Sequence, residues 1–172
     1  AAVIRDHLGD LGCRLILEPG RMLVGNAGIL VSRVIYVKEG TTRNFVICDA
    51  AMNDLVRPAM YDAYHAILPV VQAASDDASR SVENVSLHPV DVVGPICESG
   101  DTFAKQRMLP PIAKDDLIVF ATAGAYGSAM SSTYNSRPLI PEVLVKDDHF
   151  AVVRARPTYE EMLALESLPP WL

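Results

Sequence analysis

The stretch "ILVSRVIYVKEGTTRNFVICDAA", residues 29–51, carries the clearest prediction of the fold class. Two runs rich in β-branched and aromatic residues flank Glu-Gly-Thr-Thr at 39–42, the pattern of two strands joined by a tight turn. We therefore expect a mainly β domain, barrel-like or sandwich-like, with about seven strands. Further strand candidates occupy residues 65–73, 81–96, 106–112, 116–127 and 141–156, the last of them a hairpin turning at Asp147-Asp148.

The residues before this stretch have a different character. Residues 1–12 predict a helix, residues 14–18 ("RLILE") a buried strand that ends at a Pro-Gly turn, and residues 22–28 one or two helical turns. A lone helix–strand unit cannot bury both faces of its strand. We therefore expect residues 1–28 to be the end of a larger α/β domain and residues 29–172 to be the β domain.

Two more segments complete the prediction. Residues 158–168 read as a closing helix, because Thr158 and Glu161 have the spacing of a capping box. Residues 72–84 are polar and predict an exposed loop.

Composition excludes several classes of function. Half of the 172 residues are apolar, and the net charge of −6 argues against a nucleic-acid partner. No apolar run approaches the roughly 20 residues that span a bilayer. The three cysteines are widely spaced without a CxxC pair, which favours a reducing, cytoplasmic compartment. The four histidines lack ligand spacing, so we predict no metal site.

The first candidate motif is "EPGR", residues 18–21, at the end of the predicted strand. Gly20 allows backbone amides to approach a ligand, and Arg21 offers a planar fork for a phosphate or carboxylate. Glu18 could hold a ring nitrogen in its protonated form. A plain β-turn with a surface arginine is the competing interpretation.

The second motif is "RPAMYDAY", residues 57–64. If this stretch is helical, Arg57 and Tyr61 share one face and could grip a carboxylate together. A surface arginine stacked on a tyrosine explains the same spacing.

The third motif is "CESGD", residues 97–101. Glu98 beside Cys97 would raise the thiol pKa by like-charge repulsion, which favours a proton donor over a nucleophile. Glu98 itself could bind an ammonium group. The alternative is a tight turn with a half-buried cysteine.

The fourth motif is "TAGAYGSAMSSTYN", residues 122–135. Gly124 and Gly127 permit close backbone approach, and Tyr126 could line a planar cofactor. The alternative is a tyrosine at a strand end in a glycine-rich loop.

In this order, the four motifs and "YNSRP" at 134–138 resemble the meso-diaminopimelate decarboxylase family. These are pyridoxal 5'-phosphate enzymes of fold-type III, with an N-terminal TIM-type (β/α)8 barrel and a C-terminal β domain. The resemblance implies that this chain is the last α/β unit of the barrel followed by the β domain. Ornithine and arginine decarboxylases share "EPGR" but tend to carry Asp where this sequence has Glu98.

The resemblance also implies roles for the site residues. The family is homodimeric, and Cys97 and Glu98 are expected to reach into the active site of the partner subunit. The implied roles are cofactor binding for Glu18, Gly20, Arg21 and Tyr126, substrate binding for Arg21, Arg57, Tyr61, Glu98 and Tyr126, and proton donation for Cys97.

One part of the family's machinery is not found in the sequence. The family holds its cofactor as a Schiff base to a lysine in a motif that none of Lys38, Lys105, Lys114 and Lys146 matches. We therefore expect the 172 residues alone to be an inactive fragment. The alternatives are an ornithine, arginine or carboxypolyamine decarboxylase, a non-catalytic β-domain binding module and, more remotely, a racemase.

Overall fold

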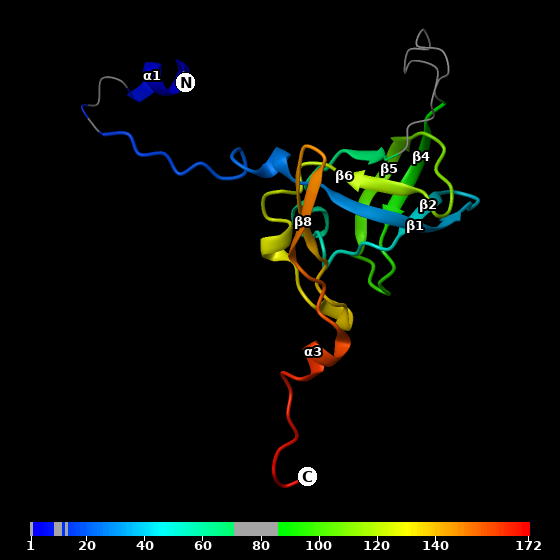
Figure 1. The fold of residues 1–172 in the computed structure, drawn as a ribbon. Coiled ribbons are helices and arrows are strands. Elements are labelled where there is room, and N and C mark those ends of the chain that lie inside the picture. The colour runs from blue at the N-terminus through cyan, green and yellow to red at the C-terminus, as the bar shows by residue number, and fades with distance from the viewer. Residues whose placement is uncertain (1, 9–11, 13, 71–85) are drawn as a thin grey trace.

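The computed structural model describes residues 2–8, 12, 14–70 and 86–172. Within these residues the chain folds into a six-stranded sheet, in the order β3-β6-β1-β2-β4-β5, and a separate β7–β8 hairpin (Figure 1). The predicted mainly β fold is thus confirmed. The strands are β1 (Leu30–Lys38), β2 (Asn44–Cys48), β3 (Ile67–Pro69), β4 (His88–Val93), β5 (Thr102–Leu109), β6 (Leu117–Phe120), β7 (Glu142–Lys146) and β8 (His149–Arg154).

The helices are short and lie outside the sheet. The closing helix has the predicted capping box, in which Thr158 N donates to the Glu161 carboxylate at 2.8 Å and Glu161 N donates to Thr158 Oγ1 at 3.1 Å. The α-helices are α1 (Ala2–Leu8), α2 (Arg57–Tyr61) and α3 (Tyr159–Leu163), and the 3-10 turns are η2 (Gly25–Ala27), η4 (Ser128–Met130) and η5 (Tyr134–Ser136).

The predicted hairpin at 29–51 forms as expected. β1 and β2 pair antiparallel, with Val37 opposite Val46. At the turn, a Cβ on Gly40 would lie 2.5 Å from the carbonyl oxygen of Arg43, so this turn demands glycine. On its other side β2 runs parallel to β4, and the connection between these two strands carries α2 and β3.

The sheet curls toward a barrel around its core. Phe103 of β5 and Phe120 of β6 are four strand spacings apart in the sheet order, or about 19 Å in a flat sheet. Their ring centroids are nevertheless 4.5 Å apart. The core fills this curled sheet, and its largest fully buried side chains are Val34, Val46, Cys48, Leu55, Val92, Ile118 and Phe120.

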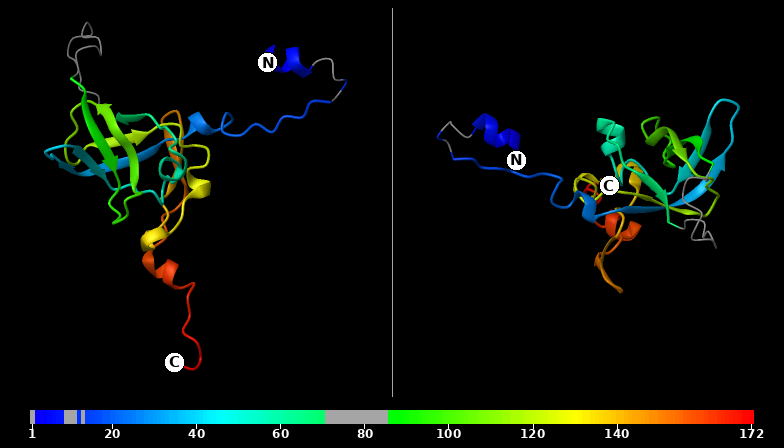
Figure 2. Two further views of the ribbon diagram at one scale, coloured as in Figure 1. Left: turned by 180° about the vertical axis from the view of Figure 1, so that it is seen from behind. Right: turned by 90° about the horizontal axis from the view of Figure 1, so that it is seen from above.

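The strand predicted at residues 14–18 is not a strand in the structure. This segment runs away from the sheet in each of the views (Figures 1 and 2), and the side chains of Leu15, Ile16 and Leu17 are 52%, 71% and 65% exposed. A strand requires hydrogen-bonded neighbours, and no described strand lies beside this segment. The boundary at residue 28 stays a prediction, and the loop predicted at 72–84 lies outside the described residues.

Candidate active site

The second motif forms the short helix α2. Pro58 lies in its first turn, and Asp62 ends it in a left-handed conformation (φ 50°), with its N–H directed at the carbonyls of Arg57 and Pro58. The helix brings Arg57 and Tyr61 to one face, as predicted, and the guanidinium carbon is 5.4 Å from the centre of the Tyr61 ring. The arginine therefore stacks on the tyrosine, which was the competing interpretation of this spacing. Stacking also restricts the orientation of the guanidinium.

A second tyrosine joins this pair from the loop after β6. The guanidinium carbon of Arg57 is 5.1 Å from the ring centre of Tyr126. Tyr126 has φ 61°, the left-handed region that an aromatic residue rarely adopts. Such strain persists where the surrounding structure enforces it, often at functional positions. We refer to Arg57, Tyr61 and Tyr126 as the arginine–tyrosine cluster.

The "EPGR" motif lies directly against this cluster. A Cβ on Gly20 would be 3.0 Å from the hydroxyl of Tyr126, so the glycine allows the turn to approach the ring. Arg21 is exposed and opens a helical turn, in which Gly25 N donates to the Arg21 carbonyl at 2.7 Å. Glu18 is exposed on the extended segment that precedes the turn.

A tight backbone contact holds the two loops together. A Cβ on Gly124 would lie 2.0 Å from the carbonyl oxygen of Val24, and Ala123 N donates to the Gly28 carbonyl at 2.8 Å. The close approach predicted for Gly124 is therefore present, and its partner is the chain that follows "EPGR".

The "CESGD" motif forms the turn between β4 and β5. Cys97 and Glu98 are both exposed, so the half-buried cysteine of the competing interpretation is not found. One carboxylate oxygen of Glu98 accepts a hydrogen bond from Gly100 N at 3.0 Å. The thiol and the carboxylate of adjacent residues are thus presented together at the surface.

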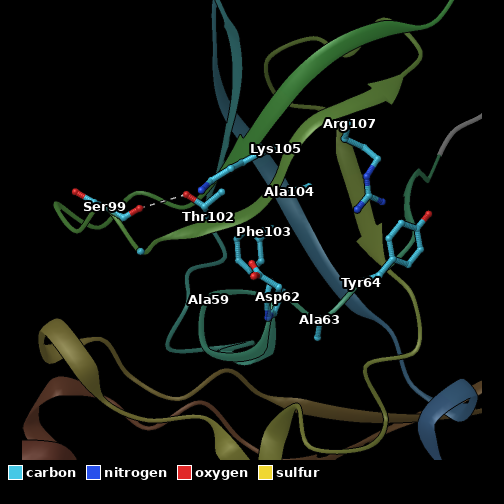
Figure 3. Close-up of a pocket in the computed structure, with 12 residues that line it drawn as sticks. Ala59, Asp62, Ala63, Tyr64, Ser99, Thr102, Phe103, Ala104, Lys105 and Arg107 are labelled. Carbon is cyan, nitrogen blue, oxygen red and sulfur yellow. Dashed lines mark hydrogen bonds between the residues drawn. The ribbon is translucent and has the colours of Figure 1, made fainter.

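A cavity of about 260 Å³ separates this turn from α2 (Figure 3). Arg107 and Tyr64 face each other at one end, with the guanidinium carbon 4.2 Å from the ring centre, and Ser99 lies at the other end. The lining residues are Pro58, Ala59, Asp62, Ala63, Tyr64, Ser99, Gly100, Thr102, Phe103, Ala104, Lys105 and Arg107. They include neither Cys97 nor a member of the arginine–tyrosine cluster.

Comparison with known proteins assigns the chain to a family. Residues 7–124 match the pyridoxal-dependent decarboxylase, C-terminal sheet domain. The chain belongs to this family. It is 48% identical over 160 residues to a diaminopimelate decarboxylase of Zymomonas mobilis, covering 93% of this chain and 35% of that protein.

Solved structures of the family have the same fold. The M. jannaschii diaminopimelate decarboxylase in complex with L-lysine matches with a TM-score of 0.80 and 35% identity, over 99% of this chain and 36% of that one. The Helicobacter pylori enzyme complexed with L-lysine matches with a TM-score of 0.77 and 40% identity, over 94% and 37%. The chain thus spans little more than a third of the length of these relatives.

The decarboxylase fold brings some predicted site residues together and leaves others apart. Gly20, Arg57, Tyr61 and Tyr126 converge on one surface, with Arg21 next to Gly20. The contacts of the described residues do not connect Cys97 or Glu98 to that surface.

Sequence reasoning missed a polar network that supports the decarboxylase motifs. The guanidinium of Arg137, in "YNSRP", donates to the Asn53 side chain at 3.1 Å and to the Asp49 carbonyl at 2.6 Å, and lies 3.7 Å from the Asp54 carboxylate. Asn53 in turn donates to the Ser132 carbonyl at 3.0 Å. This network ties the loop after β6 to the segment that leads into α2. Its one signal in the sequence is the polar pair at 53–54 within an otherwise small and apolar stretch.

No helix in the described part of the chain is both long and apolar enough to cross a membrane.

Proposed function

We propose that this chain is the C-terminal part of a pyridoxal phosphate-dependent decarboxylase that converts meso-2,6-diaminopimelate to L-lysine and CO2. The observation that carries this proposal is the convergence of Arg57, Tyr61 and Tyr126 beside the "EPGR" turn. Relatives named diaminopimelate decarboxylase, one of them 48% identical, support the same substrate.

The residues present fit pyridoxal 5'-phosphate. Gly20 lies so close to the hydroxyl of Tyr126 that a side chain at this position would crowd it, and the next residue, Arg21, is an exposed cation. In this proposal Gly20 and Arg21 hold the phosphate, Tyr126 contacts the ring, and Glu18 contacts the ring nitrogen. The bound cofactor withdraws electrons from the carbon that loses CO2, and the protein's residues orient the substrate and handle the proton.

The arginine–tyrosine cluster explains selectivity for a substrate with a second carboxylate. The Arg57 guanidinium presents two parallel N–H donors, and the Tyr61 hydroxyl is a third donor on the same face of α2. A substrate without the distal carboxylate, such as ornithine, would leave this partly buried arginine unpaired, which costs binding free energy. Glu98 would bind the ammonium group next to that carboxylate.

Cys97 and Glu98 are proposed to act in the active site of a second copy of the protein. Both side chains are exposed on the β4–β5 turn, where they are free to enter a neighbouring site. Cys97 would there deliver the thiol proton to the carbon that lost CO2, and Glu98 would contact the distal amine. The active enzyme is therefore expected to be a homodimer. Its cytoplasmic location stays a prediction from the cysteine count.

The test uses the full-length product of the gene that encodes this chain. The protein is supplied with pyridoxal phosphate and, separately, with meso-diaminopimelate, ornithine or arginine, and the amine formed is identified by mass spectrometry. We expect L-lysine from meso-diaminopimelate alone, and no product from the 172-residue chain by itself. Formation of putrescine or agmatine would be consistent with a decarboxylase that uses this cofactor. It would contradict the roles proposed for Arg57, Tyr61 and Glu98.

A further inference from the structure

The strongest unexplained feature is the buried carboxylate at the end of "CESGD". Asp101 is 3% exposed, and each of its two carboxylate oxygens accepts a backbone hydrogen bond, one from its own turn and one from the segment leading into α2. Met52 N, in the segment leading into α2, donates to Oδ1 at 2.7 Å. Ile96 N, next to Cys97, donates to Oδ2 at 2.8 Å. The Asp101 side chain thus ties its own turn, through Ile96, to the segment around Met52, which is 49 residues away in the sequence.

The backbone of the same residue closes the Cys97 turn, which we define as residues 94–101. Asp101 N donates to the Glu98 carbonyl at 3.0 Å, and Gly94 N donates to the Asp101 carbonyl at 3.0 Å. Gly94 also leaves the room that the carboxylate occupies, because a Cβ there would lie 2.3 and 2.4 Å from the two carboxylate oxygens. Gly94 and Asp101 therefore depend on each other.

We propose that Asp101 is a positioning residue, which fixes the turn bearing Cys97 and Glu98 against the segment that leads into α2. This role rests on the proposed function, in which Cys97 donates the proton. Asparagine cannot take it over, because an amide has one acceptor oxygen and would direct its NH2 group at one of the two backbone donors. The mismatch leaves a buried N–H without an acceptor and loosens the turn.

The consequence for activity should fall on turnover more than on binding. The segment before α2 has a second tie, through Asn53 and Arg137, which persists when Asp101 is changed. The Cys97 turn loses the hydrogen bond next to its thiol. A misplacement of about 1 Å at a reacting group can reduce the rate by roughly 100-fold.

The first experiment measures hydrogen exchange in the full-length protein, with Asp101→Asn and the matched control Asp91→Asn. Asp91 is equally buried and also accepts a backbone hydrogen bond, from Gln106 N at 2.7 Å, but it lies on β4. We expect exchange at the amides of Met52 and Ile96 to rise about tenfold or more in Asp101→Asn and to stay unchanged in the control. Unchanged exchange in Asp101→Asn would overturn the proposal.

The second experiment measures steady-state kinetics with meso-diaminopimelate. Asp101→Asn is expected to lower kcat about 10- to 100-fold while KM changes less than about threefold. Gly94→Ala should have the same effect, since it displaces the carboxylate without removing its charge. In a Cys97→Ala background, Asp101→Asn should lower kcat no further, because the positioned group is already absent.

Two kinetic outcomes would overturn the positioning role. One is an undiminished effect of Asp101→Asn in the Cys97→Ala background, and the other is an equal loss of kcat in Asp91→Asn. Failure of the wild-type protein to form lysine would count against the proposed function instead. The exchange at Met52 and Ile96 would then still decide whether Asp101 holds the turn.

Discussion

Replacement of Arg57 by alanine in the full-length protein tests the substrate site most informatively. The guanidinium carbon lies 5.4 and 5.1 Å from the ring centres of Tyr61 and Tyr126. Two such partly exposed cation–π contacts contribute about 1–2 kcal/mol together, so the variant should remain folded. Two charge-assisted hydrogen bonds to the substrate carboxylate contribute about 3–4 kcal/mol, allowing for their non-additivity.

This loss of binding free energy corresponds to a rise in KM of about 100- to 1,000-fold, since each 1.4 kcal/mol is roughly tenfold. We expect kcat to change less than about threefold, because the distal carboxylate is remote from the reacting carbon. Arg57→Lys keeps the charge but loses the fork and most of the ring stacking, and should recover only about tenfold in KM.

Steady-state kinetics with meso-diaminopimelate measures both constants. The control is Arg33→Ala, because the Arg33 side chain is exposed and its guanidinium donates, among the described residues, to the Asp115 carbonyl alone, at 3.1 Å. Cys97→Ala provides the opposite pattern, with a large fall in kcat and little change in KM. A fall in kcat of equal size in Arg57→Ala and Cys97→Ala, with KM unchanged in both, would refute this division of roles.

Three further predictions concern reactivity, stability and pH. Burial raises the pKa of Cys48 to about 12. Iodoacetamide at pH 8 should therefore label the exposed Cys97 at least about 100-fold faster than Cys48, as measured by peptide mass spectrometry. Equal labelling rates of the two cysteines would contradict this. Gly124→Ala places a Cβ 2.0 Å from the Val24 carbonyl oxygen and should destabilise the protein by roughly 3 kcal/mol, so an unchanged Tm would argue against the contact. Burial raises the pKa of Asp54, so the folded state binds this proton more tightly than the unfolded state. The unfolding free energy of the wild type, minus that of Asp54→Asn, should therefore increase as the pH falls from 7 through the raised pKa of Asp54. Chemical denaturation measures this difference, and a difference that does not change with pH would contradict the prediction.

The elements that could be predicted from the sequence are those with local signals. The β1–β2 hairpin and the capping box of α3 depend on residues within a few positions of one another, and both form as predicted. The strand predicted at 14–18 depends on neighbours supplied by other segments, and the described chain contains none for it. β5 begins at Thr102, four residues before the predicted start at 106.

The candidate site divides in the same way. Arg57 and Tyr61 are four residues apart, so helical geometry alone predicts their shared face. Tyr126 is 69 residues from Arg57 and 65 from Tyr61 in the sequence, and only the folded sheet, or resemblance to a family, places it beside them. The hydrogen bonds of the Asp101 carboxylate could not be predicted from the sequence, because its partners are backbone N–H groups, which every residue except proline carries.

A crystal structure of the full-length protein with pyridoxal phosphate and L-lysine tests the proposed substrate site directly. We predict that the lysine carboxylate accepts hydrogen bonds from Arg57 and Tyr61 at about 2.7–3.2 Å, with Glu98 of the partner subunit at the adjacent amine. A lysine carboxylate bound away from Arg57, with Arg57 still stacked on Tyr61 and Tyr126, would contradict the proposed role of Arg57.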